Sequence, residues 1–142
     1  MLDEKQVGRD LYEKIEELFA EFDPFLCEGD EENRNVVLGT LIDSLEKAGA
    51  AAIDCDLMER LSRFRDWAEN YPRGDEAADD LYTSYVVSFV EGMLEHESLY
   101  RLAPAIISKE DLIRGKDYFY TWIGPGEYHR ALTAFPNGEG AN

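Results

Sequence analysis

Nucleophilic or metal-assisted chemistry in this chain would depend on two cysteines and two histidines. Neither Cys27 nor Cys55 stands in a motif that places a histidine base beside the thiol, as thiol catalysis requires. His96 and His129 lack the HExxH spacing of a zinc site, so a metal would need long-range convergence with carboxylates. The sequence contains no glycine-rich phosphate-binding motif. We therefore expect a protein that is not an enzyme and that holds no metal and no cofactor.

Acidic side chains dominate the composition. The chain carries 31 aspartates and glutamates against 14 lysines and arginines, a formal net charge of −17. Residues 1–103 hold 26 of these acids and 10 of the bases, so the negative field belongs to the first three quarters of the chain. Such a field repels nucleic acids and anionic membranes and attracts basic protein surfaces. The alternative is that the acidity only keeps a small protein in solution.

The acids gather in two stretches, each of which begins with Gly-Asp-Glu and leads into a predicted helix. If the two turns lie on one edge of the fold, their side chains form a concentrated negative surface that a basic partner would recognise. The alternative is that the acids only stabilise the starts of their helices through the helix dipole. The candidate partner-binding residues are Asp30, Glu31, Glu32, Asp75, Glu76, Asp79 and Asp80.

The second stretch opens the segment around which we expect the chain to fold. Residues 74–94 combine acids at the start with the most apolar run in the sequence, spaced by three and four residues as on one broad helical face, and the helix is expected to end near Glu97. This pattern predicts a central, largely buried helix, in which Val87→Asp would bury an unpaired charge and unfold the protein. Its apolar positions are Leu81, Tyr82, Tyr85, Val86, Val87, Phe89, Val90, Met93 and Leu94.

Amphipathic patterns predict further helices over residues 3–22, 30–47 and 56–70. Asp54 or Asp56 is expected to cap the last of these, because short acidic side chains accept hydrogen bonds from free amides at a helix start. The class is therefore all-α, in one domain spanning residues 1–142.

The C-terminal part of the chain has a different character. Ser108 resembles the start of a capping box, and residues 116–123 are dense in aromatics and can be helical or extended. The aromatic side chains either cover the open end of the helical core or act as exposed anchors of an interface.

Two parts of the sequence resemble each other. The segments DLYEKI and DLMERL share a D-L-x-E-basic-aliphatic pattern at an offset of 46 residues, and the two Gly-Asp-Glu triplets follow at an offset of 45. A period near 45 residues is typical of HEAT and armadillo repeats. We expect antiparallel helical hairpins at about 3–48 and 54–97, stacked as a short HEAT/armadillo-like repeat or as a five-to-six-helix bundle, with a cap at 104–135 and a tail at 136–142.

The stretch from Asp56 to Leu94, with its DLMERL and GDEAADDLYTSYVVSFVEGML segments, resembles immunity-type proteins of bacterial polymorphic toxin systems. This resemblance implies a protein that binds a cognate toxin and blocks its active site, and it carries over no specific functional residues. The expected partner is a cognate toxin, for example a nuclease, or another basic protein. The alternatives are a nucleic-acid mimic that inhibits a defence nuclease complex, a helical adaptor and, least favoured, a small enzyme.

The sequence also bears on where the protein works. The N-terminal MLDEKQVGRD is charged and lacks the apolar core of a signal peptide, and no apolar run is long enough to span a membrane. We expect a cytoplasmic protein with free thiols that binds neither membrane nor nucleic acid directly.

Overall fold

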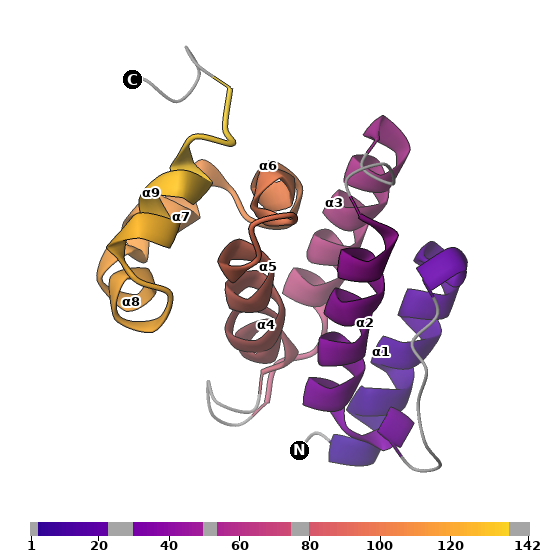
Figure 1. Ribbon diagram of the computed structural model, residues 1–142. Coiled ribbons are helices and arrows are strands. Elements are labelled where there is room, and N and C mark those ends of the chain that lie inside the picture. The colour runs from indigo at the N-terminus through magenta and orange to yellow at the C-terminus, as the bar shows by residue number, and fades with distance from the viewer. Residues whose placement is uncertain (1–2, 23–29, 50–53, 75–79, 137–142) are drawn as a thin grey trace.

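The computed structural model describes residues 3–22, 30–49, 54–74 and 80–136, and within these ranges every regular element is helical (Figure 1). The predicted all-α class is confirmed, and of residues 116–123, for which two conformations were open, 116–122 are helical in α8. None of the described helices is long and apolar enough to cross a membrane. The elements are α1 (Glu4–Leu18), η1 (Ala20–Phe22), η2 (Asp30–Glu32), α2 (Arg34–Ala48), α3 (Cys55–Asn70), α4 (Leu81–Ser84), η5 (Tyr85–Val90), α5 (Glu91–Glu95), η6 (Tyr100–Leu102), α6 (Ala103–Ile106), α7 (Lys109–Arg114), α8 (Lys116–Trp122) and α9 (Pro125–Leu132).

Local hydrogen bonds explain where several helices begin and end. The Asp54 carboxylate accepts from the Leu57 amide at 2.8 Å at the start of α3, and the Ser108 hydroxyl accepts from the Asp111 amide at 3.0 Å at the start of α7. Gly49 ends α2 at a φ of +74°, a backbone conformation that glycine adopts without steric cost. The predicted caps at Asp54 and Ser108 are therefore confirmed.

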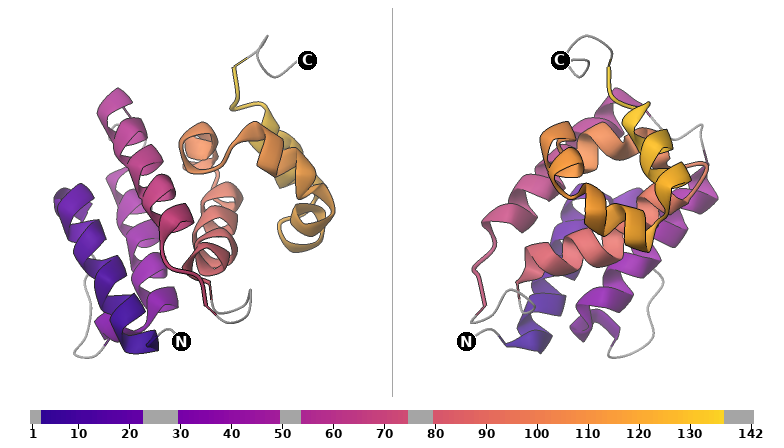
Figure 2. Two further views of the ribbon diagram at one scale, coloured as in Figure 1. Left: turned by 180° about the vertical axis from the view of Figure 1, so that it is seen from behind. Right: turned by 90° about the vertical axis from the view of Figure 1, so that its left-hand side faces the viewer.

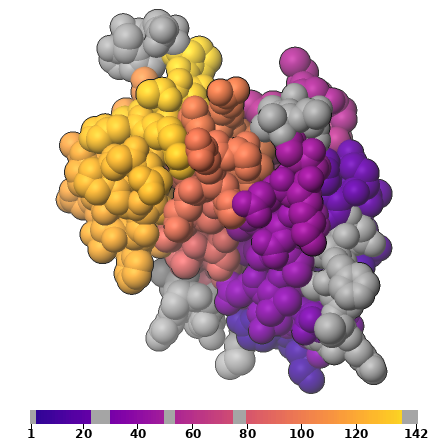
Figure 3. Space-filling view, viewed as in Figure 1, coloured from indigo at the N-terminus to yellow at the C-terminus, as the bar shows by residue number. Residues whose placement is uncertain are grey.

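The central helix is one continuous rod made of α4, η5 and α5. It lies between a layer of α1, α2 and α3 on one side and the C-terminal helices on the other (Figures 1 and 2). The C-terminal residues pack directly on this rod, so the three parts form one continuous body (Figure 3). η5 is a π-helical turn, in which the Glu91 amide donates to the Val86 carbonyl five residues back.

An aromatic cluster ties the rod to the N-terminal layer. The ring of Phe64 on α3 lies at its centre, with centroid distances of 5.6 to 6.1 Å to its neighbours. The Tyr85 hydroxyl is buried and donates to the Ile106 carbonyl at 2.7 Å, which joins the rod to α6. The rings around Phe64 are those of Phe19, Trp67, Tyr85 and Phe89.

The first predicted hairpin, at about 3–48, is wrong in direction, because α1 and α2 run parallel. Their first turns meet where Arg34 donates to both carboxylate oxygens of Glu4, at 2.5 and 3.2 Å. At the other end, η1 lies beside Ser44 and Lys47 in the last turns of α2. The charged contact at the first turns and the close packing of η2 on α1 favour this arrangement, and neither is visible in an amphipathic pattern.

The second predicted hairpin, at about 54–97, has the expected antiparallel direction. Phe64 on α3 meets Tyr85 and Phe89, and the chain that follows α3 returns to the start of α4 through an Arg73–Asp80 ion pair at 3.4 Å. Because one helix pair is parallel and the other antiparallel, the two segments do not share one hairpin geometry.

Val87 is not buried, and the prediction that it faces the core is wrong. Its side chain is 47% exposed, whereas Tyr85 and Val90 are buried. Successive helical residues are about 100° apart, so three consecutive apolar residues span too wide an arc to face one side. At the offset of 45 residues between the two Gly-Asp-Glu triplets, Ile42 corresponds to Val87, and Ile42 is buried, so the apolar phasing of the two segments differs here.

Two glycine substitutions test the close contact between α1 and η2. A Cβ on Gly8 would lie 2.6 Å from the Glu32 carbonyl carbon and 2.7 Å from the Glu31 oxygen, both backbone atoms that cannot simply rotate away. We expect Gly8→Ala to lower the free energy of unfolding by about 1–3 kcal/mol in a urea titration. Gly39→Ala in α2 meets nothing within 4 Å and should raise it by about 0.5–1 kcal/mol. Equal effects would mean that the contact is not close.

A pair of aspartate substitutions tests the orientation of the rod. Val87→Asp should leave the circular dichroism spectrum and cooperative thermal unfolding in place, because the new carboxylate reaches water. Val90→Asp places the same group at a fully buried position three residues later and should prevent folding. A folded Val90→Asp variant beside an unfolded Val87→Asp variant would contradict the orientation described above.

Candidate functional site

The histidines and the described cysteine lie apart and have separate surroundings. His96 Nδ1 lies 2.6 Å from a Glu46 carboxylate oxygen, and His129 Nε2 lies 2.6 Å from the Tyr120 hydroxyl. Cys55 is exposed at the first position of α3, and Cys27 lies outside the described residues. Across 3–22, 30–49, 54–74 and 80–136, no three of His, Cys, Asp and Glu are grouped so that they would hold a metal ion.

The described members of the two acidic stretches lie at one end of the molecule. Asp30, Glu31 and Glu32 form η2, and Asp80 immediately precedes α4, with both turns at the lower end of Figure 1. The Arg34 guanidinium, directly after η2, lies 3.4 Å from the Ser84 hydroxyl at the end of α4. We call these four acids the acidic corner; the other three predicted residues, Asp75, Glu76 and Asp79, lie outside the described residues.

Part of the charge at the acidic corner is used inside the fold. Glu32 pairs with Arg9 and lies 3.9 Å from Lys5. Asp80 pairs with Arg73 and also accepts from the Gly74 amide at 2.7 Å. These two carboxylates therefore hold η2 on α1 and close the turn before α4, a structural role that the sequence pattern alone did not indicate.

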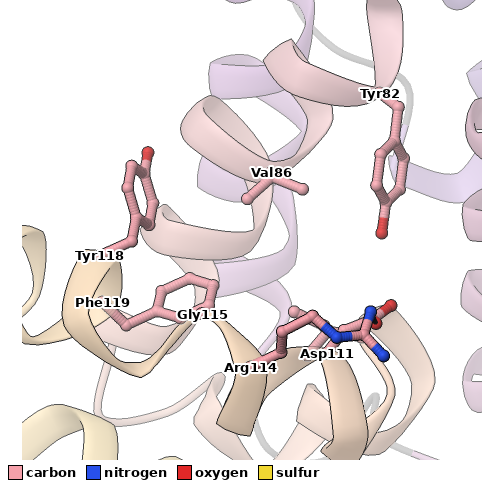
Figure 4. Close-up of a pocket in the computed structure, with 8 residues that line it drawn as sticks. Tyr82, Val86, Asp111, Arg114, Gly115, Tyr118 and Phe119 are labelled. Atoms are coloured by element: carbon pink, nitrogen blue, oxygen red, sulfur yellow. Dashed lines mark hydrogen bonds and ion pairs between the residues drawn. The ribbon is translucent and has the colours of Figure 1, made fainter.

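A shallow groove of about 380 Å³ lies between the rod and the C-terminal helices (Figure 4). Tyr82 and Val86 line it from the rod, and the opposite wall comes from α7 and α8. Its surface is mainly apolar, with the ion pair of Asp111 and Arg114, 2.9 Å long, near the Tyr82 hydroxyl in Figure 4. Tyr82 and Val86 were predicted only as core, because a helical wheel does not show where two neighbouring layers leave a groove between them.

A buried carboxylate lies beside the groove. Glu91 is 8% exposed, and the Tyr118 hydroxyl donates to it across the gap between α5 and α8. Burial raises the pKa of Glu91, the hydrogen bond from Tyr118 opposes the rise, and the nearby Glu95 carboxylate adds to it. Burial, followed by the contact with Glu91, raises the pKa of Tyr118 in turn. A titratable group with a displaced pKa beside a groove is typical of functional sites as well as of structural contacts.

The aromatic C-terminal segment combines the two roles that its sequence left open. Phe119 is buried and Tyr128 joins the core, as a covering layer requires. Trp122, by contrast, is 63% exposed, and its ring centroid lies 6.4 Å from that of Tyr118. Large exposed aromatic side chains are common anchors of protein interfaces. The density of aromatics in the sequence was the available signal, but it did not separate the buried residues from the exposed one.

The pH dependence of stability tests the Glu91 contact. The pKa of Glu91 is higher in the folded state than in the unfolded state. The ionised carboxylate therefore destabilises the fold above the folded pKa, and this destabilisation disappears as the pH falls towards the unfolded pKa of about 4. Glu91→Gln keeps an acceptor for Tyr118 and should raise the free energy of unfolding at pH 7, with the gain vanishing near pH 4. Tyr118→Phe removes the donor and should lower stability at pH 7 by about 1–3 kcal/mol. Urea titrations between pH 4 and 8 measure both, and a pH-independent effect of Glu91→Gln would contradict the assignment.

No protein-family model, no curated protein and no solved structure matches this chain. Its function must therefore be inferred from its own residues and their geometry.

Proposed function

We propose that this protein is a non-catalytic acidic binding protein that neutralises a cognate toxin by covering the basic surface of its active site. The observation that supports the proposal is the position of the acidic corner, since the described residues of both acidic stretches lie at one end of the fold. In the sequence, three more acids, Asp75, Glu76 and Asp79, precede Asp80, and these three lie outside the described residues.

Charge balance supports the proposal after internal pairing is taken into account. The two stretches contain seven predicted partner-binding acids, and within the described ranges three bases, Lys5, Arg9 and Arg73, pair with them. The seven acids of the two stretches outnumber these three bases, and their negative charge is part of the −17 of the whole chain. Such a field accelerates encounter with a positive partner surface and disfavours binding of negative ones.

A nuclease is a suitable example of the partner because its active site must be positive to hold phosphates. A nucleic-acid mimic would use the same charges, but its target would be a nucleic-acid-binding complex and not the product of a neighbouring gene. Purification of the protein together with the product of the adjacent gene tests the two functions against each other. One-to-one binding that weakens between about 50 and 200 mM salt supports the toxin inhibitor. Binding that does not change with salt would contradict the electrostatic mechanism.

Neutralisation of acids in the two stretches, with Glu32 and Asp80 left unchanged, tests their role in binding the partner. A variant with Glu31→Gln, Asp75→Asn, Glu76→Gln and Asp79→Asn leaves the structural pairs of Glu32 and Asp80 intact. We expect it to fold normally and to bind the toxin at least about tenfold more weakly, mainly through slower association. Surface-plasmon resonance measures both rate constants.

The control variant removes four exposed acids elsewhere, namely Glu13, Glu16, Asp43 and Glu97. The two variants have the same net charge, so only the position of the lost charges differs. Equal slowing of association in both would mean that overall charge, and not the acidic corner, attracts the partner.

A further inference from the structure

The groove and the acidic corner adjoin each other. Arg73, which pairs with Asp80 of the acidic corner, also lies over the ring of Tyr82 at 5.8 Å from its centroid. Tyr82 lines the groove, two residues beyond Asp80 in the chain. A partner held at the acidic corner therefore has the groove directly beside it.

We propose that the groove between the rod and α7–α8 is the docking site for a basic amphipathic segment of the partner protein. An apolar side chain of that segment enters between Val86 and Phe119, and the exposed ring of Trp122 covers the segment from α8. The inference rests on the proposed function in one respect, namely that the partner is basic.

The rod and α8, which both line the groove, also carry exposed large apolar side chains. Val87, next to Val86 on the rod, is exposed, as are Tyr118 and Trp122 on α8. A cluster of exposed large apolar side chains is unfavourable in water unless a partner covers it, and such clusters mark interaction surfaces. The small volume of the groove accommodates one or two side chains, which fits an anchor residue of a helix or extended segment and not a large ligand.

The charges around the groove favour a basic occupant over a second copy of this chain. Asp111 and Arg114 neutralise each other, whereas Glu91 makes no ion pair within the described part of the chain. A lysine or arginine beside the anchor residue would compensate the desolvated Glu91 carboxylate. A second copy would instead bring another net charge of −17 to the same surface.

A second groove, between α1 and α3, is a less suitable site. Its volume is about 250 Å³, and Trp67 lines it together with the carboxylates of α1. The Lys14 ammonium already lies over the Trp67 ring, 5.9 Å from its centroid, and pairs with Glu17 at 3.0 Å. An internal cation therefore occupies the position that a basic partner side chain would take.

The two tryptophans make the choice of groove measurable, because Trp122 contacts Tyr118, which lines the first groove, and Trp67 lines the second. The probe is a synthetic helical peptide of about 14 residues with leucines on one face and lysines on the other. Two control peptides are a scrambled one of the same composition, which lacks the apolar face, and one with glutamates in place of the lysines. We expect the patterned basic peptide to shift the indole N–H resonance of Trp122 in a nitrogen–proton correlation spectrum. The indole N–H resonance of Trp67 should not shift.

Affinity measurements with a labelled peptide use matched variants of the protein. Trp122→Ala removes an exposed ring and should weaken binding of the patterned peptide at least about tenfold. Ile113→Ala removes an apolar side chain of similar exposure, 49%, that does not line the groove, and should leave affinity unchanged. Glu91→Gln should weaken binding of the basic peptide without changing the shape of the groove.

Several results would overturn the inference. Equal binding of patterned and scrambled peptides, or a shift of the Trp67 resonance alone, would place the peptide elsewhere. A dimer in analytical ultracentrifugation that Trp122→Ala dissociates would make a second copy the occupant. If Trp122→Ala binds the toxin with full affinity while the quadruple variant of the acidic stretches binds it more weakly, the proposed docking site in the groove is rejected and the toxin proposal is kept. Specific peptide binding by a protein that captures no toxin would reject the toxin proposal and retain the groove.

Discussion

The structure depends on covering a helix that is apolar on more than one side. The rod of α4, η5 and α5 buries Tyr85 and Phe89 against α3, and α2 packs along η5. At its C-terminal end, the Arg130 guanidinium from α9 donates to the Leu94 carbonyl at 3.1 Å. One neighbouring layer cannot cover so wide an apolar surface, so helices from both halves of the chain are needed. The two layers come from different parts of the chain, and they do not cover the rod completely. The groove lies between the rod and helices α7 and α8, where their packing is incomplete.

Not every acid in this chain adds to the surface charge that a partner can reach, because some acids pair with arginines inside the fold. Glu4 compensates the guanidinium of Arg34, which is only 4% exposed and joins α1, α2 and α4. Glu21 accepts two hydrogen bonds from Arg60, at 2.8 Å each, and this contact lowers the pKa of Glu21 and links η1 to α3. Removal of Glu4 would leave the buried Arg34 guanidinium without this carboxylate, and removal of Glu21 would break a contact between η1 and α3, so both acids have a role in the fold. The charge available to a partner is what remains after such pairs.

The sequence allowed the class, the approximate helices and the caps to be predicted, because periodicity and capping are local properties. It did not allow the direction of α1 against α2, because that depends on Gly8 and Arg34, whose partners are 23 or more residues distant. The position of Val87 was missed for a related reason, since an apolar run longer than one helical face can be covered on either side. The acidic cluster could be predicted from the sequence, but its internal ion pairs could not. Glu91 could not be told from a surface glutamate in the sequence, because its contact with Tyr118 joins residues 27 positions apart.

The two surfaces would act on different steps of association. Charges at the acidic corner act over about 8–10 Å at ordinary salt and so govern how often a basic partner arrives in the right orientation. An apolar anchor in the groove acts only at contact and governs how long the complex lasts, as most affinity differences do. The Asp80–Arg73–Tyr82 contact places the end of the first surface at the start of the second. A partner attracted by charge would therefore need only a short movement along the rod to bury its apolar side chain beside Val86. Fast association and slow dissociation would then both depend on surfaces of the same helical rod.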